Sequence, residues 1–260
     1  MTPFDLTGKK AFVTGASRGI GQAIAVALAQ AGADVALVAR SEDGLAATAK
    51  QAAEAGREAF VIPADVTRQE AAEAAVAAAI DRLGHVDIVV NNAGEATSAP
   101  VAKLAPADWR RALDVIATGT FLCTREFLPG MLARRWGRVV QVASVAGLEG
   151  ARYVAHYAAA KHAVVGFTRS LALEVAGTGV TANAVCPGYA DTPMTEATLA
   201  SVGRHLGSGR DEALAAVLAS AHQSRLLSPE EIAAEVVRLC ADAASNVNGE
   251  SVRLLPGART

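Results

Sequence analysis

The sequence has little cysteine, few aromatic residues and almost no net charge. Its three cysteines, Cys123, Cys186 and Cys240, are odd in number and lack the spacing of metal ligands, so we expect reduced core thiols in a cytoplasmic protein and no metal site. A formal net charge of -2 gives no basic surface for nucleic acid or an anionic membrane. No apolar run reaches the roughly 18 residues of a membrane span, and the first ten residues do not resemble a secretory signal.

What the sequence does have is aliphatic residues: 52% of it is hydrophobic but only 4% is aromatic. This composition excludes intrinsic disorder. Short apolar runs alternate with alanine-rich helical patterns from end to end. Strands are predicted at 10–14, 34–39, 59–62, 86–90, 138–143, 180–185 and 251–255, and helices at 19–31, 42–55, 68–83, 106–134, 154–175 and 229–241. The alternation predicts a single α/β domain with a doubly wound parallel sheet and helices on both faces.

One segment, 189–228, interrupts this rhythm. It carries scattered Gly, Ser, Thr and Arg, with only a modest helical pattern at 212–219. Because it follows the carboxyl end of a strand, where open α/β sheets bind ligands, we interpret it as a substrate lid. The alternative is a disordered surface loop.

A glycine-rich loop follows the first predicted strand and opens the first predicted helix. Gly15 permits a tight turn, and Gly19 and Gly21 let the backbone approach a pyrophosphate, which the amide groups of the helix N-terminus would bind. We therefore predict a nucleotide site that also includes Ser17, Arg18 and Ile20.

The residues after the second predicted strand indicate which nucleotide the site would bind. Arg40 and Ser41 stand where an NAD site usually has an acid for the ribose 2′-hydroxyl, and Arg18 offers a second guanidinium. Guanidinium groups match phosphate geometry, so we predict NADP(H) over NAD(H). The alternative is a pair of solvated arginines.

Two further strand ends fit the same edge of the sheet. Asp65 and Val66 follow the third strand, where the carboxylate could accept from an adenine amino group. Asn92, Ala93 and Gly94 follow the fourth, where small residues could pack against the adenosine. Either alone would pass for a turn or a helix cap.

Tyr157 and Lys161 are one turn apart on a predicted helix and share a face. An ammonium beside a phenol stabilises the phenolate and should lower a pKa that starts near 10, towards the range useful for general acid–base catalysis. Ser144 ends the fifth strand, and its hydroxyl could hold a substrate carbonyl or alcohol oxygen against the tyrosine. These three residues are the predicted catalytic group.

Together, the segments 14–21 and 91–94, Ser144, the Tyr157-x-x-x-Lys161 spacing and Pro187-Gly188 resemble the motif series of the short-chain dehydrogenase/reductase family. The resemblance covers essentially the whole chain. It implies a Rossmann-type fold with a seven-stranded parallel sheet, and a dimer or tetramer paired through the helices at 106–134 and 154–175. It also implies a hydride transfer in which Tyr157 is the general acid/base.

The resemblance assigns roles to the other site residues. Ser144 would orient the substrate, and Lys161 would bond the nicotinamide ribose. Pro187 and Gly188 would pack on the nicotinamide, and Thr192 would bond its carboxamide.

One residue departs from the family pattern. Ile116 stands where the family normally has an asparagine that is thought to hold a proton-relay water. This departure keeps a second hypothesis open, a catalytically impaired nucleotide-binding or sensor protein. A third is an NAD(H)-linked alcohol dehydrogenase of the same family.

Within the family, the segments 157–168 and 184–188 are most similar to 3-oxoacyl-acyl-carrier-protein reductases and polyketide ketoreductases. The small-molecule substrate would be a ketone, such as a β-keto thioester, or the matching secondary alcohol. Residues expected near it are Glu95, Glu149, Tyr153, Tyr189 and Met194. His156 is expected to have a structural role.

Overall fold

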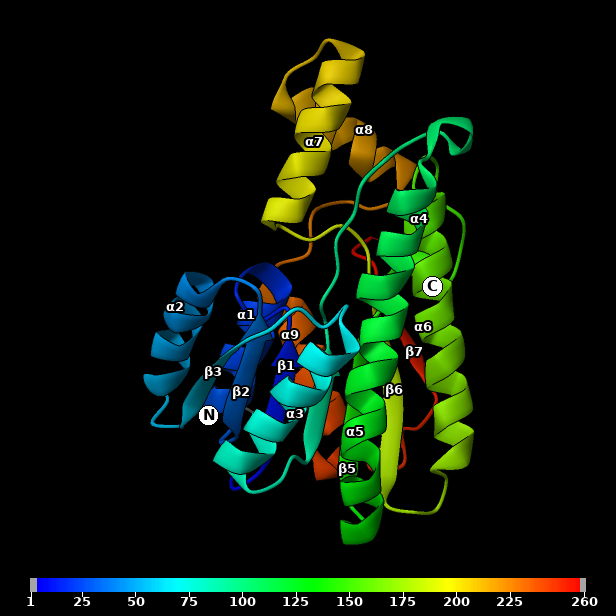
Figure 1. The fold of residues 1–260 in the computed structure, drawn as a ribbon. Helices are drawn as coiled ribbons and strands as arrows, with labels where there is room; N and C mark the ends of the chain where they lie inside the picture. Colours follow the sequence, from blue (N-terminus) through cyan, green and yellow to red (C-terminus); the bar gives the residue numbers. More distant parts are fainter. Residues whose placement is uncertain (1–3, 258–260) are drawn as a thin grey trace.

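Seven parallel strands form one sheet in the order β3-β2-β1-β4-β5-β6-β7 in the computed structural model, which describes residues 4–257 (Figure 1). The strands are β1 (Lys10–Thr14), β2 (Asp34–Ala39), β3 (Ala59–Pro63), β4 (Ile88–Asn91), β5 (Gly137–Val142), β6 (Val180–Pro187) and β7 (Ser251–Leu254). The order reverses between β1 and β4, which makes their carboxyl ends the switch point at which such sheets bind ligands. The Rossmann-type, doubly wound fold is confirmed.

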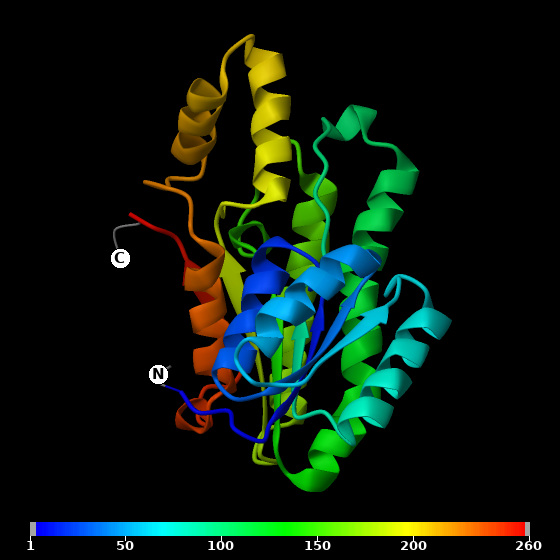
Figure 2. The same cartoon turned by 90° about the vertical axis from the view of Figure 1, so that its left-hand side faces the viewer.

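Helices cover both faces of this sheet (Figure 2). On one face lie α1 (Gly19–Gln30), α2 (Glu42–Ala53) and α9 (Pro229–Cys240). On the other lie α3 (Gln69–Leu83), α4 (Pro106–Leu113), α5 (Gly119–Arg134) and α6 (Ala155–Glu174). None of the helices in the described part of the chain has the length and hydropathy needed to cross a membrane.

Successive residues of β1 show why the strands are apolar throughout. Ala11 and Val13 pack towards α1 and α9, while Phe12 between them packs towards the opposite helices, with its ring centroid 4.8 Å from that of Phe127. Since side chains alternate between the two faces of a strand, a sheet covered on both sides needs apolar residues at every position. The three cysteines are buried and free, as expected.

The long helical region predicted at 106–134 is helical throughout, but it is not one continuous α-helix. It is divided into α4 and α5 by a π-helical turn over Asp114–Thr118, which contains Ile116. A π-turn inserts one extra residue per turn and frequently marks a functional site. Pro129 lies inside α5 without ending it.

The segment 189–228 is more regular than its composition indicates. It forms α7 (Pro193–Leu206) and α8 (Arg210–Ser220), which project beyond the carboxyl edge of the sheet in Figures 1 and 2. Only a modest helix at 212–219 was expected, so α7 is a correction. The sequence nevertheless marks where α7 begins, with two residue types that are typical of a helix start. Thr192 caps the helix by accepting a hydrogen bond from the Thr195 N–H, and Pro193 occupies the first turn.

Candidate functional site

The glycine loop has no room for a side chain at Gly15 or Gly21, and the start of α1 leaves backbone donors free. A Cβ atom added to Gly21 would lie 2.2 Å from the Gly15 carbonyl oxygen, and Gly15 itself has a φ of +66°. Arg18 precedes α1 without capping it, and the first turn of α1 contains no acid. The amide groups at this helix end are therefore available to an anion such as a pyrophosphate.

Thr14 joins this loop to the end of β4, a role that the motif analysis missed. Its hydroxyl accepts hydrogen bonds from the N–H groups of Asn92 and Ala93, both at 3.0 Å. In return, the Asn92 side chain donates to the carbonyl oxygens of Thr14 and Gly15 at 3.0 and 3.2 Å. The threonine directly before the first glycine was the available signal.

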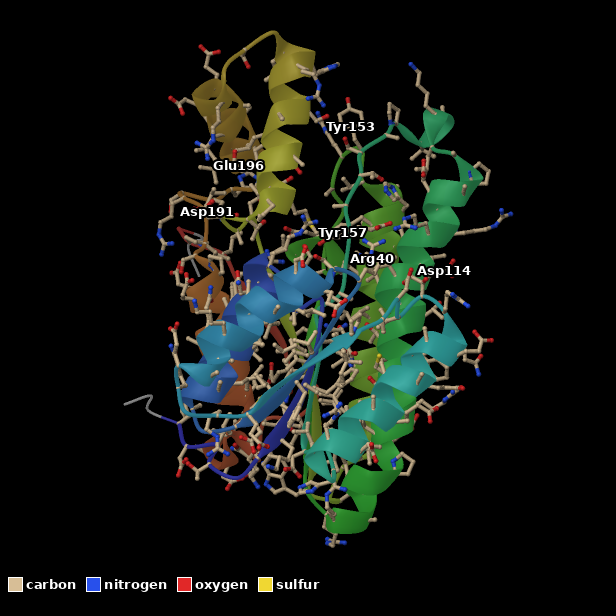
Figure 3. All side chains as sticks on the ribbon, turned by 60° about the vertical axis from the view of Figure 1, so that its left-hand side comes forward. Arg40, Asp114, Tyr153, Tyr157, Asp191 and Glu196 are labelled. Carbon is tan, nitrogen blue, oxygen red and sulfur yellow. The ribbon has the colours of Figure 1, made fainter. Side chains whose placement is uncertain are left out.

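The two arginines predicted to hold a 2′-phosphate take part in no ion pair among residues 4–257. Arg40 follows β2 directly and is exposed, at the same end of the molecule as Tyr157 (Figure 3). The next residue, Ser41, caps α2 by accepting from the Gly44 N–H. Both guanidinium groups are thus free to meet an anion.

Asp65 lies within the field of Arg40. Burial alone would raise the pKa of this carboxyl, but hydrogen bonds from Thr67 and the positive charges of Arg40 and Arg111 outweigh burial and lower it. Asp65 therefore remains an ionised acceptor. Its neighbour Val66 is buried against Gly119.

Ser144 is the second residue after β5, and its side chain contacts the end of β6. Its hydroxyl donates to the Pro187 carbonyl oxygen at 3.4 Å and accepts from the Ala146 N–H at 3.1 Å. The residue is 9% exposed, at the carboxyl edge of the sheet. The structure thus brings Ser144 together with the end of β6 at Pro187.

Tyr157 lies on the first turn of α6 and packs partly against the apolar cluster that contains Ile116 and Val164. Burial of its phenol raises the pKa to about 12, and a hydrogen bond with Ser144 opposes this rise only in part. The sequence predicted a pKa lowered by Lys161. In the protein itself burial is the larger effect, because removing the phenolate from water destabilises it.

Lys161 is 4% exposed, and its Nζ atom lies 5.6 Å from the centre of the Tyr157 ring. The ammonium donates to the Val142 carbonyl oxygen at 2.6 Å. Burial lowers its pKa from 10.5 to about 8. Because this pKa lies close to physiological pH, the Lys161 side chain can both hold and release a proton there.

Ile116 fills the space that a polar side chain would need beside this lysine. A Cβ atom placed on Gly94 would lie 3.8 Å from Lys161 Nζ and 4.0 Å from Ile116 Cγ1. Ile116 is 1% exposed and packs with Val115, Ala143 and Ala160. Its side chain offers no hydrogen bond, so any water beside Lys161 needs other partners.

The base of the projecting helices lies against the glycine loop. A Cβ atom on Gly19 would lie 3.4 Å from Thr192 Cγ2. Thr192 thus stands between the glycine loop and α7, although its hydroxyl also caps that helix. This contact places the predicted phosphate-binding and carboxamide-binding positions next to each other.

The two acids expected near the substrate are both paired. Glu95 forms a forked ion pair with Arg111, and Glu149 pairs with Arg253 at 3.2 Å. His156 is 2% exposed and its Nε2 atom lies 2.8 Å from Thr97 Oγ1, in line with a structural role.

The aromatic and thioether side chains expected near the substrate differ in exposure. Tyr153 is 59% exposed and Met194 is 41% exposed. Tyr189 is partly buried against Leu199 of α7. Figure 3 shows Tyr153 beside the projecting helices and Tyr157 nearer the middle of the molecule.

Across residues 4–257, no group of three or more His, Cys, Asp and Glu side chains is arranged to hold a metal ion. One edge of the sheet carries free backbone donors at the start of α1, the arginines Arg18 and Arg40, and the group Ser144, Tyr157 and Lys161. This arrangement can bind a dinucleotide and move a proton to or from an oxygen atom.

Comparison with known proteins agrees with this geometry. The family model described as short chain dehydrogenase matches residues 9–202. The chain is 40% identical over 253 residues to a 3-oxoacyl-acyl-carrier-protein reductase of Vibrio cholerae, which covers 97% of this chain and 98% of that protein. It is 38% identical to a D-beta-hydroxybutyrate dehydrogenase of Cupriavidus necator, over 94% and 95% of the two chains.

Among solved structures, a variant of the actinorhodin polyketide ketoreductase with NADPH superposes with a TM-score of 0.91. It is 39% identical in sequence and covers 96% of each chain.

Proposed function

This chain belongs to the short-chain dehydrogenase family of NAD(P)-dependent oxidoreductases, and on that premise we propose that it reduces a ketone to a secondary alcohol with NADPH. The observation that carries the proposal is the grouping of Ser144, Tyr157 and Lys161 at the sheet edge that also holds the glycine loop. We propose these three as the catalytic residues.

The residues at the glycine loop fit a dinucleotide. A pyrophosphate would bind the free N–H groups of α1, close to Ser17, Ile20 and Gly21. Asp65 would accept from the adenine amino group, and Asn92, Ala93 and Gly94 would pack against the adenosine. NADP(H) is proposed over NAD(H) because Arg18 and Arg40 form no ion pair among residues 4–257.

The bound cofactor would supply a hydride to the carbonyl carbon. Tyr157 would donate its phenolic proton to the carbonyl oxygen, so that C=O becomes CH–OH and a phenolate remains until solvent reprotonates it. Ser144 would donate a second hydrogen bond to the same oxygen. With its pKa raised to about 12, Tyr157 is protonated at neutral pH, as a proton donor must be. Because the same rise makes the phenol a weaker acid, the phenolate would need stabilisation.

Lys161 would stabilise the phenolate once it forms. Its ammonium lies close to the Tyr157 ring and would also bond the nicotinamide ribose. Pro187 and Gly188 would form the surface against the nicotinamide, and Thr192 would bond its carboxamide. Ile116 supplies no polar atom to this arrangement, so reprotonation would proceed without a side chain at that position.

The proposed substrate is a ketone with an apolar portion, such as a β-keto thioester. Glu95 and Glu149 are neutralised by arginines, which leaves Tyr153, Tyr189 and Met194 as the proposed lining. We propose α7 and α8 as a lid on this single-domain enzyme. Exposed Phe121 and Leu173 on α5 and α6 support a dimer or tetramer.

The experiment mixes the protein with NADPH and a panel of ketones and follows the absorbance of the reduced nicotinamide. Consumption that depends on the ketone supports the proposal. NADPH binding without turnover of any ketone, aldehyde or alcohol would support the sensor that Ile116 keeps open. Faster turnover with NADH than with NADPH would support the NAD(H)-linked dehydrogenase instead.

A further inference from the structure

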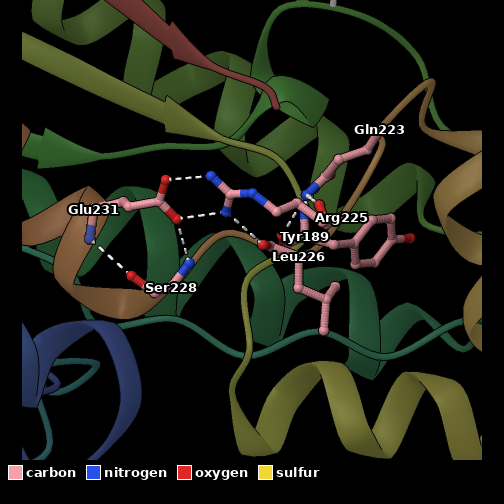
Figure 4. Close-up of polar contacts among 6 residues, drawn as sticks. All are labelled: Tyr189, Gln223, Arg225, Leu226, Ser228 and Glu231. Carbon is pink, nitrogen blue, oxygen red and sulfur yellow. Dashed lines mark hydrogen bonds and ion pairs between the residues drawn. The ribbon is translucent and has the colours of Figure 1, made fainter. Parts of the chain in front are cut away.

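The side chain of Gln223 binds the backbone of the segment that leaves β6. Its Oε1 atom accepts from the Tyr189 N–H at 2.9 Å, and its Nε2 atom donates to the Tyr189 carbonyl oxygen at 2.6 Å (Figure 4). Nε2 also donates to the Arg225 carbonyl oxygen at 2.6 Å. Gln223 is 6% exposed, so these contacts replace water that cannot reach the amide.

Both polar groups of the Tyr189 backbone are therefore bound by one side-chain amide, as they would be by a neighbouring strand. The pairing continues beyond it, because the Leu227 N–H donates to the Tyr189 carbonyl oxygen at 3.0 Å and the Asp191 N–H donates to Leu227 at 2.9 Å. The outgoing and returning legs of the α7–α8 segment are thus joined at their base.

The returning leg is itself fixed to α9. Arg225 forms a forked ion pair with Glu231, with contacts of 2.6 and 2.7 Å, and Ser228 and Glu231 form the capping box of that helix (Figure 4). Gln223 therefore connects Tyr189 to a part of the chain anchored in the main body of the fold.

Gly188 shows how closely the amide fits. A Cβ atom on Gly188 would lie 2.4 Å from Gln223 Oε1 and 2.8 Å from Leu255 Cδ1. The chain after β7 completes the enclosure, since the Gly188 N–H donates to the Leu254 carbonyl oxygen at 2.9 Å. The backbone at 187–189 is held from three sides, one of which is the Ser144 hydroxyl on Pro187.

We infer that Gln223 is a positioning residue: it fixes the position of the 187–189 backbone and thereby the distance between the nicotinamide and the substrate carbonyl carbon, whose oxygen would be held by Ser144 and Tyr157. This inference rests on the proposed function. Hydride transfer requires reacting atoms about 3–3.5 Å apart, so a small shift of this surface slows it steeply. The proposed pyrophosphate and adenosine sites lie at the ends of β1, β2, β3 and β4, and none of the hydrogen bonds of Gln223 reaches them.

The principal test is Gln223→Leu, which keeps the approximate size of the side chain and removes all three hydrogen bonds. We expect kcat to fall by about tenfold or more, while the Kd of NADPH changes by less than about threefold. The same substitution at exposed Gln51 on α2 is the matched control and should change neither value. Unchanged kcat in a folded Gln223→Leu protein would overturn the inference, as would equal losses in kcat and in NADPH affinity.

Gln223→Glu provides a second variant that keeps one acceptor for the Tyr189 N–H. It loses the two donated bonds and directs carboxylate oxygens at the Tyr189 and Arg225 carbonyls. If the leucine variant does not fold, a folded Gln223→Glu protein with reduced kcat and normal NADPH affinity supports the inference, and wild-type kcat overturns it.

Hydrogen exchange separates this inference from the proposed function, because it needs no substrate. The Tyr189 amide should exchange about tenfold faster or more in Gln223→Leu, which has no acceptor for it, than in the wild-type protein, both with NADPH present, while amides of β1 stay protected. Unchanged exchange at Tyr189 would overturn the positioning role even if ketones are reduced. Faster exchange in a protein that turns over no ketone would support the positioning of the backbone and reject the proposed reaction alone.

Discussion

Lys161 Nζ donates a 2.6 Å hydrogen bond to the carbonyl oxygen of Val142, the last residue of β5. This bond ties the second turn of α6 to the edge of the sheet, two residues before Ser144. Tyr157 lies one turn earlier on α6, so the bond fixes the proposed acid relative to the serine. The three proposed catalytic residues are thereby positioned by one contact between a helix and a strand.

The burial of this ammonium predicts a pH dependence of stability. Because the pKa of Lys161 is lowered from 10.5 to about 8, the folded protein releases this proton at lower pH than the unfolded chain does. The contribution to the free energy of unfolding therefore rises between pH 8 and 10.5, by about 3 kcal/mol. Lys161→Met should lack that rise.

Urea unfolding at pH 7 and pH 10.5 measures this effect. Between pH 7 and pH 10.5, the free energy of unfolding of the wild-type protein should rise relative to that of Lys161→Met. The exposed Lys50→Met variant should show the same pH dependence as the wild type. The raised pKa of Tyr157 acts in the opposite direction above pH 10, but it is present in all three proteins. If the free energies of unfolding of the wild type and Lys161→Met differ by the same amount at both pH values, the pKa of Lys161 is not lowered in the folded protein.

The choice of cofactor is tested by Arg40→Asp. The substitution replaces a cation that would bind the 2′-phosphate with an anion that repels it, so the Kd of NADPH should rise by about tenfold or more. The Kd of NADH, measured by the same nicotinamide fluorescence titration, should stay within about threefold. Arg82→Asp at the far end of α3 is the charge-matched control. Equal losses for both cofactors would reject the phosphate contact.

The alternation of apolar strands and helices was enough to predict all seven strands and the helices α1, α2, α3, α6 and α9 in place, because a sheet covered on both faces imposes its pattern on the sequence. The π-turn at Asp114–Thr118 was not predictable, since Val115 and Ile116 read equally well as one continuous helix. Helix α7 was missed because Gly203 and Ser201 interrupt its apolar pattern, although Thr192 and Pro193 mark its start.

The site was predictable where backbone geometry demands a residue type, as at Gly15 and Gly21. The sequence did not predict which partners the long charged side chains would find. Glu95 and Arg111, for example, are far apart in the sequence and form their ion pair only in the folded protein. The pKa of Tyr157 was predicted in the wrong direction, since the sequence shows the neighbouring lysine but not the burial of the phenol.

Ile116→Asn tests what the isoleucine contributes. An amide at this position would be buried in an apolar cluster, so the free energy of unfolding should fall by about 1–3 kcal/mol. Ile116→Val, which keeps the site apolar, should lose about 0.5–1.5 kcal/mol. Urea unfolding gives the free energy of unfolding of both variants, and an asparagine variant as stable as the wild type would show that the position tolerates a polar group and its water.

Turnover of the folded asparagine variant then shows whether the proton route uses this position: an unchanged kcat means that it does not.

The most direct test of the account is Tyr157→Phe, which removes one hydroxyl group from the proposed acid. With a ketone that the wild-type protein reduces, kcat should fall by about 10²–10⁴-fold, while the Kd of NADPH stays within about threefold. A phenylalanine variant that reduces the ketone at the wild-type rate would contradict Tyr157 as the proton donor.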